Sequence, residues 1–318
     1  MAKAQAKLVK EAQKIGRSRA REILKLRAVA QRKRRSARTA RAKAAGLSAR
    51  ASMALAAESP GVLVAEGDSW FDYPFFDVLK NLEDIYGYDV ESVAHKGDAV
   101  EEMAYGGQLV EFARRVEKVL DRGELLKAIL LSGGGNDVAG DEFGMLLNHR
   151  VSAIRGLNGS VVSGVIDERI RAAYITILTI ITQICIEKTG AAIPILVHGY
   201  DYPVPDGRGY LGGWWVLPGP WMEPGFRKKG FDDLDQNTEI ARQLIDRFNE
   251  MIKGVAALPS FSHVKYVNLR KTLSNGPYYK KWWDNELHPT KEGFKEVTKK
   301  FVIELTKLSG TSPPAPPP

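Results

Sequence analysis

The chain has 318 residues, of which 44% are hydrophobic and 26% are charged, and its formal net charge is +8. This composition excludes a disordered, collagenous or disulfide-stapled chain and is typical of a globular protein with one sizeable core or two small ones. The single cysteine, Cys185, cannot form an internal disulfide. Nothing in the sequence therefore indicates an oxidising compartment.

The positive charge is concentrated at the start of the chain. Residues 1–50 contain 17 Lys and Arg but only two acids, a local net charge of +15, whereas the other 268 residues carry 29 Lys and Arg against 36 Asp and Glu. We interpret residues 1–57 as a basic, Ala-rich and helical arm whose apolar residues form only a thin stripe, too little to build a core. This arm is either a solvated tail or a nonspecific contact for a polyanion through residues 1–50, with its densest charge at residues 32–35.

The sequence predicts neither a membrane span nor a secretory signal. No stretch reaches the roughly 18 to 20 apolar residues that a bilayer requires, and Thr and Gln interrupt the most apolar one, residues 172–186, which we expect to be a buried helix. The charged N-terminus lacks the apolar centre of a signal peptide. We therefore expect a cytoplasmic protein, with an organellar transit peptide as the alternative.

After Pro60, short apolar runs alternate with helical periodicities. We expect strands at residues 61–65, 88–94, 127–131, 193–197 and 264–268, and helices at residues 76–86, 100–120, 166–188, 237–255 and 291–308. Such alternation predicts a mainly parallel five-stranded sheet inside a three-layer α/β/α sandwich over residues 58–309. Residues 139–164 and 200–230 are insertions expected to shape a ligand site, and residues 310–318 are a Pro-rich disordered tail.

Small and polar residues follow three successive predicted strands. The first strand leads into Gly67-Asp68-Ser69, the second into Gly97 and the third into Gly134-Gly135-Asn136-Asp137. Because parallel strands end at one edge of the sheet, a hydroxyl and several N–H donors can meet there, as a tetrahedral oxyanion requires. Gly-Asp-Ser alone is ordinary turn chemistry. Late in the chain, His288 stands on a loop before the final predicted helix and can reach back over the first strand.

These blocks resemble the SGNH (GDSL) hydrolase family of esterases and lipases over roughly residues 61–308. The resemblance implies a flavodoxin-like sheet, Ser69 as nucleophile and His288 as base. It also implies an oxyanion hole formed by the N–H groups of Ser69 and Gly97 and the side chain of Asn136. The expected activity is hydrolysis of a carboxylic ester, of the esterase, lipase or acetylhydrolase type, without a cofactor or a metal.

One position departs from the family pattern, whose last block is Asp-x-x-His. The residue three before His288 is Asn285, and the carboxylate Asp284 lies four before it. A carboxylate holds the imidazole tautomer and stabilises the imidazolium, which an amide does poorly. We favour Asp284 as the orienting group. The alternatives are that Asn285 or a main-chain carbonyl orients the ring, or that the site is weakened.

The substrate is less defined by the sequence. All six tryptophans fall in or near the expected site, and they either line a pocket for an acyl group or glycan or anchor long loops. The candidates for substrate contact are Trp70, Trp282, Trp283, Trp214 and Trp215. We expect an ester of a small molecule, a lipid or an acylated glycan. Two other functions compete: a catalytically weak binding protein of the same fold, and a polyanion-binding or assembly protein that acts through the arm.

Overall fold

The computed structural model describes residues 2–45, 60–212 and 217–308. Its centre is a five-stranded sheet in which all neighbouring strands are parallel. The strands are β1 (Val62–Glu66), β2 (Asp89–Ser92), β3 (Leu126–Leu131), β6 (Ile195–His198) and β7 (Val264–Val267). The five predicted strands are confirmed. The central strands β1, β3 and β6 are short, mostly apolar and buried, as expected inside a parallel sheet, whereas the edge strands β2 and β7 also carry exposed polar residues.

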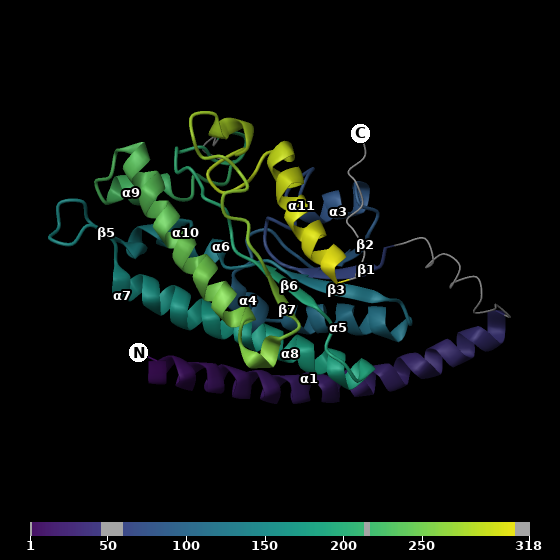
Figure 1. Cartoon of the computed structure of the whole chain (residues 1–318). Coiled ribbons are helices and arrows are strands. Elements are labelled where there is room, and N and C mark those ends of the chain that lie inside the picture. Colours follow the sequence, from purple (N-terminus) through teal and green to yellow (C-terminus); the bar gives the residue numbers. More distant parts are fainter. Residues whose placement is uncertain (1, 46–59, 213–216, 309–318) are drawn as a thin grey trace.

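Helices cover both faces of this sheet (Figure 1). On one face, α3 (Val78–Asp84) packs against α11 (Lys291–Lys307). On the other face, α8 (Arg171–Thr189) contacts α4 (Val100–Tyr105), α5 (Gln108–Asp121) and α10 (Leu234–Ala256). The expected three-layer α/β/α architecture is therefore confirmed. The strand order β2-β1-β3-β6-β7 places a topological switch point beside β1, where open sheets of this kind bind ligands.

The helix α8 lies at the centre of its layer. By length and composition alone, the helical stretch Gly159–Thr189 is apolar enough to cross a membrane, but 61% of its most apolar window is buried inside the fold. Most of the side chains of α8 are buried, from Ala173 through Cys185. We therefore interpret it as a core helix, apolar around most of its circumference because other elements surround it.

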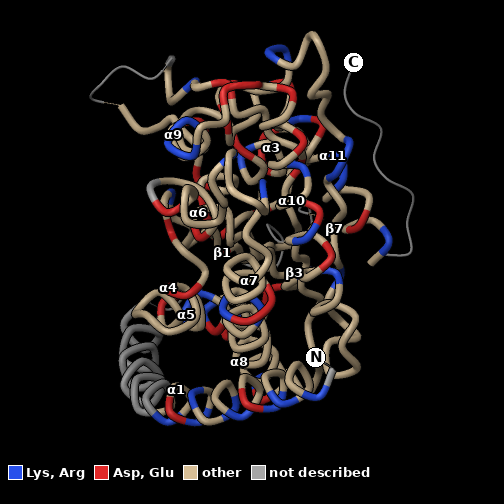
Figure 2. Tube along the Cα trace, turned by 90° about the vertical axis from the view of Figure 1, so that its left-hand side faces the viewer, with Lys and Arg blue, Asp and Glu red and all other residues tan. Residues whose placement is uncertain are grey.

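The N-terminal segment forms one long helix, α1 (Ala2–Ala45), which packs along the outer side of α8 (Figures 1 and 2). Ala12, Ala20 and Ile23 on this helix are buried within the hydrophobic core. The thin apolar stripe of α1 thus joins the core of the α/β body, because small residues at this spacing allow α1 to approach α8 closely. At Gly16, an added Cβ would lie 3.0 Å from the Cβ of Thr179.

The two insertions contain short elements. The first holds a 3₁₀ helix at Asp141–Leu146, the hairpin of β4 (Leu147–Asn148) with β5 (Gly156–Leu157), and α7 (Gly159–Val162). A π-helical segment, Ser163–Ile170, then leads into α8. The second insertion holds a 3₁₀ turn at Tyr210–Gly212 and α9 (Glu223–Lys228). Other short helices are α6 (Gly135–Val138), Pro259–Phe261 and Tyr279–Lys281. The expected tail at residues 310–318 lies outside the described residues.

Candidate active site

Ser69 lies just past the carboxyl end of β1, on a turn that only a glycine permits. An added Cβ on Gly67 would lie 2.7 Å from the Cβ of Ser132, so the end of β1 passes too close to the end of β3 for any side chain there. The main chain is also tied to the loop after β2, because His95 N donates to Gly67 O at 2.8 Å. The turn therefore presents the half-buried hydroxyl of Ser69 at the switch point of the sheet.

The side chain of His288 meets this hydroxyl from the other end of the chain. Ser69 Oγ lies 2.7 Å from Nε2 of His288, although 219 residues separate them in sequence. The histidine stands on the loop that precedes α11. The indole of Trp70 ties this loop to the serine turn, because its Nε1 donates to Leu287 O at 3.1 Å. The fold thus holds a hydroxyl and an imidazole in hydrogen-bonding contact, the arrangement expected of a nucleophile and its base.

The far nitrogen of this ring, Nδ1, contacts Asn285 and not Asp284. Asn285 Oδ1 lies 2.9 Å from Nδ1 of His288 and also accepts the main-chain N–H groups of Leu287 and His288, each at 3.0 Å. Because two main-chain donors identify this atom as the amide oxygen, Nδ1 must carry the proton. Nε2 is then free to accept a proton from Ser69. The preference for Asp284 at this position is wrong, since a tight turn of the loop directs Asn285 inward.

Asp284 contributes indirectly to the site, through Tyr73. The hydroxyl of Tyr73 donates to Asp284 Oδ2 at 2.8 Å and accepts from Asn285 Nδ2 at 3.0 Å, while Asn285 Nδ2 lies 3.4 Å from the same carboxylate oxygen. The ring of Tyr73 stacks on the ring of His288 with centroids 4.4 Å apart. Burial and then the hydrogen bond to Asp284 raise the pKa of Tyr73, so its hydroxyl remains a donor. Tyr73 and Asp284 therefore fix which way the Asn285 amide faces.

His288 is almost fully enclosed, with 6% of the residue's surface exposed. Burial lowers its pKa to about 3 from the ordinary value of 6.5. The amide at Nδ1 brings no charge that would counter this desolvation. His288 is therefore neutral across the physiological pH range, the protonation state in which a histidine can act as a base.

Two of the expected oxyanion donors come from the loops after β2 and β3. Gly97 adopts φ +92°, a conformation that favours glycine, although an added Cβ would meet nothing within 4 Å. Asn136 lies on α6 and donates one amide hydrogen to Asp98 O at 2.9 Å. An amide nitrogen carries two hydrogens, so the second is available to a ligand. Asn136, Ser69 and His288 line the same cavity.

A tyrosine that the sequence analysis missed links the serine turn to the Asn136 turn. The hydroxyl of Tyr200 donates to Asp68 and accepts from Gly135 N at 3.0 Å. The other carboxylate oxygen of Asp68 accepts from Trp70 N at 3.0 Å and from Ser132 Oγ at 2.7 Å. Asp68 and Tyr200 thus hold the loops after β1, β3 and β6 in one arrangement. No sequence signal marks Tyr200, because it lies in an insertion far from both motifs.

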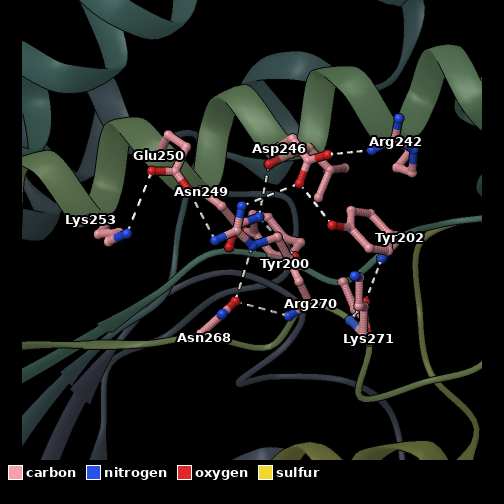
Figure 3. A network of polar contacts seen from close by, with 12 residues as sticks. Tyr200, Tyr202, Arg242, Asp246, Asn249, Glu250, Lys253, Asn268, Arg270 and Lys271 are labelled. Atoms are coloured by element: carbon pink, nitrogen blue, oxygen red, sulfur yellow. Dashed lines mark hydrogen bonds and ion pairs between the residues drawn. The ribbon is translucent and has the colours of Figure 1, made fainter.

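Helix α10 fixes Tyr200 in turn, through a network of polar contacts (Figure 3). Asn249 Nδ2 donates to the main-chain oxygen of Tyr200 at 3.0 Å. Asp246, one turn earlier, accepts from the hydroxyl of Tyr202 at 2.7 Å and from Arg270 at 3.2 Å. The start of the second insertion is therefore attached to a long helix and to the segment after β7.

The second insertion is also attached to the histidine loop through Glu286. This carboxylate is fully buried and accepts four main-chain N–H groups, from Gly207, Trp221, Met222 and Glu223, at 2.6 to 3.0 Å. Burial raises the pKa of Glu286, while the hydrogen bonds of these N–H groups act in the opposite direction. The insertion is consequently held over the site, and the ring of Trp221 lies 5.3 Å from that of His288.

The cavity at Ser69 is narrow, with a volume of about 40 Å³. Its apolar lining includes Val138, Met222, Leu244, Ile245 and Leu287. Of the candidate tryptophans, Trp70 and Trp283 line it, both with almost no exposed surface. Trp282 lies on a different hollow, beside Tyr202. Trp214 and Trp215 are outside the described residues. In the described part of the chain, no three His, Cys, Asp or Glu side chains stand together to hold a metal ion.

No protein-family model matches the chain, and no curated protein matches it. Among solved structures, the chain is similar to the lipase Lip_vut3 from a goat rumen metagenome, at 16% identity and a TM-score of 0.44 over 76% of this chain and 95% of that one. It is also similar to a catalytic mutant of Axe2, an acetylxylan esterase from Geobacillus stearothermophilus, at 15% identity and a TM-score of 0.41 over 78% and 94%.

A third similar structure is LAE5, an alpha/beta hydrolase enzyme from the metagenome of Lake Arreo, Spain. Its identity is 13% and its TM-score 0.43, over 79% of this chain and 97% of that one. The structural neighbours are thus a lipase, an acetylxylan esterase and a further hydrolase, all at low identity. At these values no residue role is transferred from them to this chain.

Proposed function

We propose that this protein is a serine hydrolase of the SGNH type that cleaves carboxylic esters. The observation that carries the proposal is the 2.7 Å contact between Ser69 Oγ and His288 Nε2 at the carboxyl edge of the sheet. His288 takes the proton of Ser69 as Oγ attacks the ester carbonyl, and the leaving alcohol receives that proton. Water activated by the same imidazole then releases the acid from the acyl-enzyme.

The negative oxygen of the tetrahedral intermediate would be stabilised by the N–H groups of Ser69 and Gly97 and by the free amide hydrogen of Asn136. Removal of one such donor costs about 10² to 10³ in rate in comparable sites. In this mechanism Asn285 orients the imidazole, and Tyr73 and Asp284 position Asn285. The orienting group is an uncharged amide, so the imidazolium formed in the transition state gains less stabilisation than a carboxylate would give.

The size of the cavity supports an ester with a short acyl group. A single water needs roughly 10 to 15 Å³ by the same measure, so about 40 Å³ accommodates only a few heavy atoms. We therefore expect acetyl and propionyl esters to be cleaved faster than octanoyl esters. A preference for the longer chain would contradict this substrate class without affecting the assignment of the nucleophile.

The test of the proposed function compares the protein with its Ser69→Ala variant on an aryl acetate. We expect kcat/KM to fall by at least about a thousandfold, because the nucleophile is lost. A fluorophosphonate should also add its phosphonyl group to Ser69, detectable by mass spectrometry, and leave the variant unmodified. If both proteins are equally inactive and unlabelled, the alternative of a binding protein with a weakened site holds instead. The observation that favours this alternative is the uncharged amide of Asn285 at Nδ1 of His288.

A further inference from the structure

The outward face of α1 is lined with cations. In the described part of this helix, the exposed charged side chains are Lys3, Lys7, Lys10, Glu11, Lys14, Arg17, Arg19, Arg21, Glu22 and Lys25. Basic residues thus outnumber acidic ones by eight to two among these side chains, and Figure 2 shows them along the coloured, first part of the helix. Among the side chains that the structure describes, one ion pair lies on α1, between Arg19 and Glu22. The remaining positive charge is not matched within the helix.

The opposite face of α1 is occupied by the body of the protein. Ala12, Gly16, Ala20 and Ile23 are buried against α8, and Gln13 Nε2 donates to Ser260 Oγ at 2.8 Å. The cations are therefore held on a docked helix and not on a loose tail. Where the side chains of α1 are described, Ile15 is the single large apolar residue left exposed. The apolar stripe that would insert into a bilayer is already buried against α8. This burial argues against a lipid surface as the partner.

The shape of this surface indicates the class of partner. Forty-four residues of helix are about 66 Å long at the usual rise per residue. The cations described on it, from Lys3 to Lys25, cover about half of that length. Arg17, Arg21 and Lys25 also border a groove of about 360 Å³ between α1 and α8, on whose other wall lie Gln183 and Glu187. A straight row of positive charge matches a linear polyanion with regularly spaced charges, such as a nucleic-acid backbone.

We propose that the outward face of α1 binds the phosphate backbone of duplex nucleic acid without sequence preference. Residues 51–318 carry a net charge of −7 and repel a polyanion. This repulsion confines the contact to α1. The proposal is independent of the hydrolase assignment, since none of these cations belongs to the cavity at Ser69.

The test uses the full chain and a fluorescent 20-base-pair duplex, with binding measured by anisotropy over a salt series. The variant carries Lys10→Glu, Lys14→Glu, Arg17→Glu and Arg21→Glu. We expect affinity to fall by more than about a hundredfold, and the slope of log K against log salt to become shallower by about 3 to 4, since each phosphate contact contributes about 0.9. The matched control reverses four exposed lysines elsewhere, at Lys228, Lys253, Lys280 and Lys300, and should bind almost as the unmodified protein does.

Circular dichroism of both variants verifies that α1 is still folded. The proposal is overturned if the two variants lose affinity equally, because net charge alone would then explain binding. It is also overturned if the unmodified protein does not bind the duplex at low salt, or if it binds vesicles containing phosphatidylserine and not the duplex. A second duplex of unrelated sequence should give the same affinity, and a strong preference between the two would contradict backbone recognition.

Discussion

Asn285 gives the proposed base a hydrogen-bond acceptor that carries no charge. With burial lowering the pKa of His288 to about 3, the imidazole becomes protonated only at unusually low pH. The acid limb of kcat/KM, which reports the base in the free enzyme, should therefore lie well below the ordinary histidine value of 6.5. Activity measured on an aryl acetate from pH 3.5 to 8 tests this expectation, and an acid limb near 6.5 or above would contradict it.

A single substitution should move that limb. Asn285→Asp places a carboxylate 2.9 Å from Nδ1, in the position of the amide oxygen, and an opposite charge at this distance favours the imidazolium. We expect the acid limb to rise by one pH unit or more. Asn285→Ala is the control, because it removes the contact without adding charge and should lower kcat/KM without raising the limb. A limb that does not move in Asn285→Asp would show that Asn285 does not face the base.

Glu66, at the end of β1, is a buried acid outside the proposed mechanism. One of its oxygens accepts from Gly67 N at 2.9 Å, and the other has no hydrogen-bond partner among the described residues. Burial raises its pKa to about 8 from 4.5. Because the folded state retains this proton longer than the unfolded state, its contribution to stability is complete below about pH 4.5 and is lost as pH rises through 8.

Glu66→Gln should therefore reduce the loss of stability between about pH 4.5 and 8. The amide has the same shape and can still accept from Gly67 N, but it has no proton to lose. We expect the urea midpoint of the unmodified protein to fall between pH 5 and pH 8.5 by more than that of the variant. The exposed Glu142→Gln is the control and should follow the unmodified protein. Parallel pH profiles for all three proteins would show that Glu66 is not the group responsible.

At the scale of elements, the strands were predictable and the ends of the helices were not. The central strands β1, β3 and β6 are short and mostly apolar, whereas the single helix expected at residues 100–120 is divided into α4 and α5 at Gly106 and Gly107. At Gly106 an added Cβ would lie 2.6 Å from Glu102 O, so the chain turns too sharply there for any other residue. The apolar periodicity of the sequence continues across this break, because α4 and α5 each bury an apolar face. The pattern therefore predicts one helix where the structure has two.

The site was predictable to the extent that it follows from strand ends. Ser69, Gly97 and Asn136 succeed three neighbouring strands, and topology alone brings them to one edge. The choice between Asp284 and Asn285 depends on a turn in which Asp284 N donates to His288 O at 2.9 Å. No local pattern in the sequence specifies that turn. The sequence likewise did not predict that Glu286 anchors the second insertion, because Gly207, one of the residues that donate to Glu286, is 79 residues away from it in the chain.

At the scale of the whole molecule, the basic segment and the α/β body pack as one unit where α1 lies on α8. The sequence suggested a separate arm because its apolar side chains are few. The contact is made instead by small residues four positions apart, Ala12, Gly16 and Ala20, with Ile23 one turn beyond. Small residues at this spacing bring two helix backbones together, and packing at short range then substitutes for bulky side chains.

This contact predicts the effect of enlarging one residue at its centre. An added Cβ on Gly16 would already lie 3.0 Å from Thr179 Cβ and 3.3 Å from Thr176 O, so Gly16→Leu forces α1 away from α8 at a cost of about 1 to 3 kcal/mol. Ser18→Leu, on the exposed side of the helix, is the control and should change stability by less than about 0.5 kcal/mol. Urea unfolding measures both free energies, and limited proteolysis reports whether α1 has separated from α8. Equal stability of the two variants would show that α1 does not belong to the folded unit, since a clash in a helix that is free in solution has no cost.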